Sequence, residues 1–94
     1  MTDVAIDFDK VETLRKHLLL SKTHMAEVLG VTRVSYHQWL LNTRPTRKSI
    51  DKLKVSLQKI IEVMTAENWP DTEVLGMSSA RRKEHLLALM SVPD

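Results

Sequence analysis

The sequence predicts an all-α protein, a domain of about five helices with a C-terminal helical extension. Only two of its 94 residues are glycine and three are proline, and this scarcity of turn-forming residues favours long helices with few connections. Apolar residues recur three and four positions apart, as they do on the buried face of an amphipathic helix. The chain length allows one small domain and excludes a large catalytic cleft between two domains.

Residues typical of helix caps predict where each helix begins and ends. Asp9 and Glu12 have the spacing of a capping box, and Gly30 stands where a helix end requires a left-handed residue. Residues 1–8 alternate in polarity, which predicts an N-terminal arm or a short strand. The predicted helices are 10–19 after Asp9, 22–29 after Ser21, 33–41 after Thr32, 47–66 after Thr46, a short helix with Pro70 in its first turn that ends at Gly76, and 79–91 after Ser78 or Ser79.

The positive charge is concentrated in the middle of the chain. The whole chain has a net charge of only +2, but residues 22–59 contain eight basic and two acidic side chains, a net charge of +6. Residues 60–80 contain four acidic side chains and none that is basic. This asymmetry indicates a polyanionic partner for the central segment.

Several classes of function are not expected. The chain has no cysteine, so it has neither a disulfide framework nor a cysteine zinc site, and its four histidines are dispersed. It shows no nucleophile elbow and no glycine-rich phosphate loop, so we expect no enzymatic activity, no cofactor and no metal. Its apolar runs are short and its start is acidic, so we expect neither a membrane span nor a secretory signal, and a cytoplasmic location.

The segment 22–42, KTHMAEVLGVTRVSYHQWLLN, resembles the helix-turn-helix of the Cro/C1-type repressor family. The resemblance extends over about residues 10–65 and implies a lambda-repressor-like fold that binds DNA. The sequence departs from the family at Tyr36, where valine or isoleucine is usual, and at Leu41 and Asn42, which end the third helix. The residues that match are Ala26, Leu29, Gly30, Val31, Thr32 and Trp39.

The helix predicted over residues 33–41 has two chemically different faces. At about 100° per residue, Tyr36 and Trp39 fall on one side. The opposite side is predicted to contact DNA bases and consists of Arg33, Val34, His37 and Gln38. In the major groove, arginine pairs with guanine, glutamine pairs with adenine, and valine contacts the methyl group of thymine.

The resemblance also implies contacts to DNA phosphates and a homodimer on a palindromic site. The phosphate contacts fall at helix starts and in the following loop, at Lys22, Thr23, Thr32, Thr43, Arg44 and Arg47. The predicted dimer surface consists of two residues off the apolar stripe of the helix 47–66, Val55 and Val63, together with Trp69, Leu86 and Met90. The chain then divides into an arm (1–8), a helix-turn-helix domain (9–66) and a dimerising extension (67–94).

The expected function is therefore sequence-specific binding of double-stranded DNA by a phage or plasmid regulator. Such a protein acts as a repressor when it occupies an operator and excludes polymerase. Two alternatives keep the DNA-binding module: an antitoxin whose C-terminal part binds a toxin, and an accessory protein of DNA packaging or recombination. A third alternative is a helical protein-interaction module whose basic face meets an acidic protein.

Overall fold

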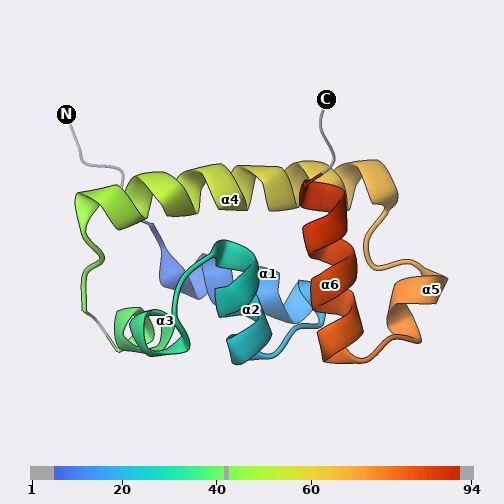
Figure 1. Ribbon diagram of the computed structural model, residues 1–94, viewed down its shortest axis with the longest axis horizontal. Helices are drawn as coiled ribbons and strands as arrows, with labels where there is room; N and C mark the ends of the chain where they lie inside the picture. Colours follow the sequence, from blue (N-terminus) through green and yellow to red (C-terminus); the bar gives the residue numbers. More distant parts are fainter. Residues whose placement is uncertain (1–5, 42, 92–94) are drawn as a thin grey trace.

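Six α-helices make up the part of the chain that the computed structural model describes, residues 6–41 and 43–91 (Figure 1). These ranges contain no strand, so the all-α prediction is confirmed. No helix within them is long and apolar enough to cross a bilayer. The helices are α1 (Phe8–Leu18), α2 (Lys22–Leu29), α3 (Arg33–Leu40), α4 (Arg47–Glu67), α5 (Thr72–Leu75) and α6 (Ser79–Met90).

Side-chain caps start the middle helices where they were predicted. Ser21 accepts a hydrogen bond from the backbone N–H of His24 at the start of α2. Thr32 and Thr46 cap α3 and α4 in the same way, each by accepting from the N–H three residues later. Each such bond satisfies one of the N–H groups that a helix start leaves without a partner.

The predicted starts of α1 and α5 are wrong. Asp7, rather than Asp9, caps α1, so the helix begins at Phe8 and Glu12 is not part of a capping box. At α5 the cap is Asp71, and the helix begins after Pro70 instead of including it. The predicted arm lies mostly in residues 1–5, outside the described residues, and Phe8 belongs to α1.

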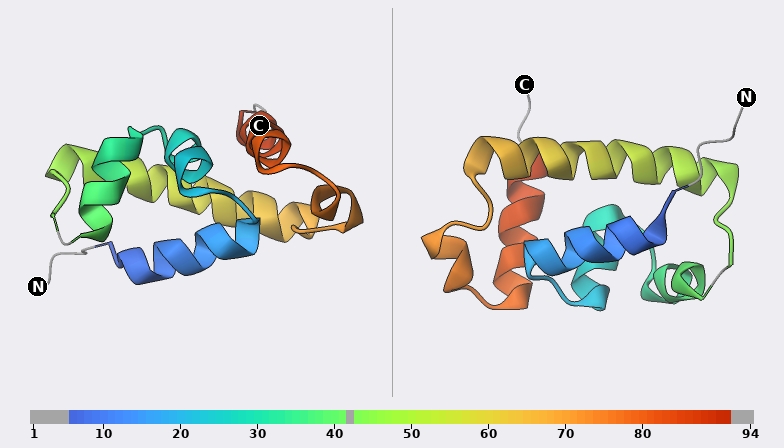
Figure 2. Two further views of the ribbon diagram at one scale, coloured as in Figure 1. Left: turned by 90° about the horizontal axis from the view of Figure 1, so that it is seen from below. Right: turned by 180° about the vertical axis from the view of Figure 1, so that it is seen from behind.

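The helices surround one apolar core. The left view of Figure 2 shows α1 on one side of α4 and α2 with α6 on the other. Figure 1 shows α3 at the end of the molecule where α4 begins, but at the edge opposite α4. All six helices contribute to this core. Its buried residues are Val11, Leu18, Leu20, Met25, Ala26, Val28, Leu29, Tyr36, Trp39, Leu53, Ile60, Trp69, Val74 and Leu86.

The C-terminal segment, residues 67–91, packs into this same core. Trp69 is buried and its indole Nε1 donates to the carbonyl oxygen of Leu18 at 3.3 Å. Leu86 is completely buried. These two residues therefore cannot form the predicted dimer surface, which is a correction to that prediction. Val63 and Met90 are partly buried against the core, and of the five residues only Val55 is largely exposed.

Candidate functional site

The connection between α2 and α3 is a tight turn built on one glycine. Gly30 has φ +75°, a left-handed conformation that glycine adopts without strain. Its N–H bonds back to Ala26 and Glu27, and its carbonyl accepts a 2.7 Å hydrogen bond from the Lys52 ammonium of α4. The turn brings α3 against α2, giving the geometry of a helix-turn-helix.

The two faces of α3 are as different in the structure as in the sequence. Tyr36 and Trp39 are buried, and the Trp39 ring lies beside Phe8 of α1 with the ring centres 5.7 Å apart. The residues predicted to contact bases share the outer face and are all exposed: Arg33, Val34, His37 and Gln38. The aromatic side of α3 therefore packs into the core, and the opposite side is exposed.

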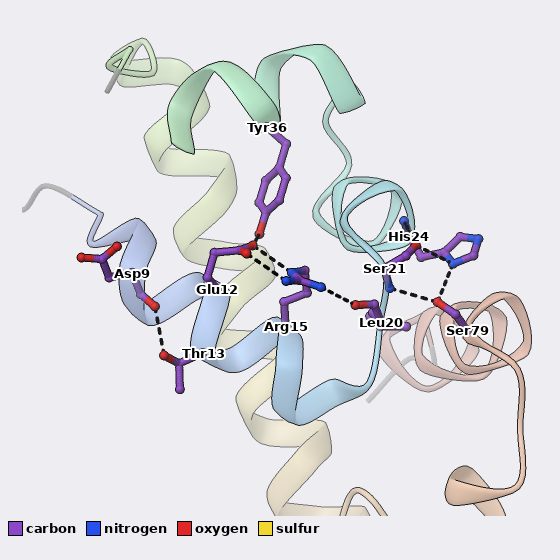
Figure 3. A network of polar contacts seen from close by, with 9 residues as sticks. All are labelled: Asp9, Glu12, Thr13, Arg15, Leu20, Ser21, His24, Tyr36 and Ser79. Atoms are coloured by element: carbon purple, nitrogen blue, oxygen red, sulfur yellow. Dashed lines mark hydrogen bonds and ion pairs between the residues drawn. The ribbon is translucent and has the colours of Figure 1, made fainter. Parts of the chain in front are cut away.

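A partly buried network of hydrogen bonds connects α3 to α1. The Tyr36 hydroxyl donates to the Glu12 carboxylate, and the Arg15 guanidinium donates to both oxygens of that carboxylate at 2.9 Å (Figure 3). Arg15 also donates to the carbonyl oxygen of Leu20, in the connection that leads to α2. Sequence reasoning missed this network because it assigned Glu12 to a capping box.

The network shifts the pKa values of its members. Burial by itself raises the pKa of Glu12, but the hydrogen bonds from Arg15 and Tyr36 outweigh it, and the pKa lies below its ordinary 4.5. Burial and the hydrogen bond to Glu12 raise the pKa of Tyr36, so its hydroxyl remains a donor. Since folding favours the ionised Glu12, the stability it contributes is present above pH 4.5 and is lost as the pH falls through the lowered pKa.

We therefore expect the cost of Glu12→Gln to depend on pH. At pH 7 the substitution removes the charged partner of Arg15 and is expected to cost about 1 kcal/mol of unfolding free energy. As the pH falls through the lowered pKa, the wild-type carboxyl becomes protonated, so the cost is expected to decrease between pH 7 and pH 2. Urea denaturation at pH 7 and at pH 2 measures this loss of unfolding free energy, with Glu62→Gln on the exposed side of α4 as the control. A cost that stays constant over this range would contradict the network.

The residues predicted to contact phosphates are all exposed. Lys22 and Thr23 begin α2, and Thr32 precedes α3. At the other end of α3, the Thr43 N–H bonds to the Gln38 carbonyl, which keeps the loop carrying Thr43 and Arg44 close to that helix. Arg47 is also exposed, but it starts α4 at the far end of this loop (Figure 1).

The basic run at residues 81–83 has a structural role that the sequence did not reveal. The Arg82 guanidinium donates to three carbonyl oxygens, those of Leu19, Val74 and Leu75, at 2.8–3.2 Å. Lys83 pairs with Glu27 of α2 at 3.1 Å. Leu19 and Glu27 are distant in sequence from these side chains, and Val74 and Leu75 lie beyond one helical turn, so no local pattern indicates the contacts.

The start of α6 is fastened to the start of α2. The Ser79 hydroxyl accepts from the N–H of Ser21 at 3.0 Å and lies 2.6 Å from the His24 Nδ1 (Figure 3). The C-terminal helix thus supports α2, the helix that precedes α3.

Compared with known proteins, the chain matches no family model, no curated protein and no solved structure.

Proposed function

We propose that this protein binds double-stranded DNA and recognises its sequence by placing α3 in the major groove. The observation that carries the proposal is the division of α3 into a buried aromatic side and an exposed side with Arg33, His37 and Gln38. A guanidinium, an imidazole and a carboxamide supply the donors and acceptors that distinguish base pairs in that groove. The resemblance of residues 22–42 to the Cro/C1-type helix-turn-helix supports the same function.

The positive charge around α2 and α3 lies where phosphate contacts would be needed. Lys22 and Thr23 lie at the start of α2, and Arg44 lies in the loop that follows α3. A positive side chain is therefore available both before α2 and after α3. Contacts at these places position a helix along the groove without reading its sequence. We further propose that the bound protein acts as a regulator, repressing transcription by covering its site.

The proposed DNA-binding unit is the single chain. Val55, the largely exposed member of the predicted dimer surface, lies on α4, and Figure 1 shows α4 and α3 on opposite sides of the molecule. A symmetric pair formed through the outer face of α4 would direct its two α3 helices away from each other. Pairing on a palindrome would therefore need another surface, and the stoichiometry on DNA is a separate measurement.

We expect Arg44→Ala to weaken binding to all duplexes by a similar factor. Because a phosphate contact releases a counterion, the slope of log K against log salt concentration is expected to become shallower by about one unit. A titration of labelled duplex by fluorescence anisotropy at several salt concentrations measures both effects. Lys59→Ala, which removes the same charge from the exposed side of α4, is the matched control. Equal flattening by both variants would contradict the proposed placement of DNA.

A further inference from the structure

The two most exposed large apolar side chains of the described residues lie at the two ends of α3, Val34 in its first turn and Leu41 as its C-cap. Val34 and Leu41 are each 66% exposed, whereas Val55, Ile61 and Leu75 are 55–58% exposed. Neither Val34 nor Leu41 packs against the core, in contrast to the neighbouring Leu40. The stability of the fold therefore does not explain why these two positions are apolar.

Both side chains belong to the face that is proposed to meet DNA. Leu41 is the C-cap of α3 and follows His37 by four residues, so it lies one helical turn further along the same face. Val34 and Leu41 are seven residues apart, which corresponds to about 10 Å along a helix. That length matches about three base-pair steps of 3.4 Å.

The major groove offers one apolar group to such side chains, the C5-methyl of thymine. We propose that Val34 and Leu41 each contact a thymine methyl, so that the preferred site carries A·T pairs about three steps apart, on either side of the base pairs that His37 and Gln38 reach. For Leu41 this is a role in base recognition additional to the four residues above. The inference rests on the proposed DNA binding and specifies part of the sequence that it selects.

Replacing thymine by deoxyuridine tests the inference, because this exchange removes the methyl group and keeps the hydrogen-bonding pattern. In a site selected from random duplexes, each thymine is replaced in turn and the affinity measured. We expect two positions, about three steps apart in the selected site, to lose about fourfold each, the value of one buried methyl group. The remaining exchanges are expected to have little effect.

Protein variants connect each methyl to its side chain. Leu41→Ala is expected to bind the thymine and uracil forms equally at one of the two positions, and Val34→Ala at the other. Leu75→Ala, which removes an exposed leucine from α5, is expected to keep both preferences. Circular dichroism checks that all three variants are folded.

Two results overturn the inference for different reasons. If a site is selected but its affinity does not depend on thymine methyls, or depends on them equally in Leu41→Ala and wild type, Leu41 has no such role while the proposed DNA binding stands. If no sequence is selected, the proposed recognition of DNA fails and this inference fails with it.

Discussion

Leu86→Ala is expected to destabilise the protein by about 3 kcal/mol, the largest effect on stability that we predict. Leu86 is completely buried and belongs to the core to which all six helices contribute. Its truncation leaves a cavity in addition to the lost transfer free energy of the deleted atoms. A domain of this size is stable by only about 5–15 kcal/mol, so the midpoint of denaturation is expected to fall markedly.

Leu75→Ala is the matched control, because it removes the same atoms from a leucine of the C-terminal segment that is 58% exposed. Its cost is expected to be below about 0.5 kcal/mol. Urea denaturation followed by circular dichroism measures both variants, and each is expected to unfold in one transition. Equal costs for the two variants, or a separate transition of residues 67–91, would contradict a single core.

Arg33→Ala is expected to weaken binding to a selected site by about 1–3 kcal/mol. Arg33 is the first residue of α3 and is exposed, so its guanidinium is available for a bidentate contact with guanine. On random duplexes only its general attraction to phosphates is lost, and the effect is expected to be small. Titrations of both duplexes therefore report a change in the specificity ratio.

Arg33→Lys separates the two contributions of this side chain. Lysine keeps the positive charge but lacks the planar pair of donors that fits guanine. We expect it to restore the affinity for random duplexes while leaving much of the specificity lost. If Arg33→Ala weakened both duplexes by the same factor, Arg33 would be a phosphate contact and would not read bases.

The helix ends that could be predicted from the sequence are those set by residues close together in the chain. Ser21, Gly30, Thr32 and Thr46 each act on backbone groups a few residues away. Both ends of α2 and the starts of α3 and α4 follow from them. The start of α1 was harder to predict, because Asp7 and Asp9 are both suitable caps. The selection of Asp7 allows Phe8 to join α1 and lie beside Trp39, a tertiary contact that local patterns do not contain.

For the candidate site too, local patterns in the sequence did not predict the contacts between distant helices. The periodicity of α3 separates an outer polar face from Tyr36 and Trp39, and the structure buries both aromatic residues. The contact of Tyr36 with Glu12 joins two helices, and the contacts of Arg82 join three segments of the chain. The family resemblance ends near residue 65, so residues 67–94 are predicted as a dimerising extension. Apolar periodicity shows that a helix has a buried side but not which residues cover that side.

Selection of bound sequences from a pool of random duplex DNA, followed by a salt titration of the enriched site, tests the central claim most directly. The proposal predicts an enriched motif of a few base pairs, with an affinity that falls steeply as the salt concentration rises. The motif is expected to change when Arg33 or Gln38 is replaced by alanine. A pool that remains random after repeated selection, or an affinity independent of salt, would contradict sequence-specific binding through α3.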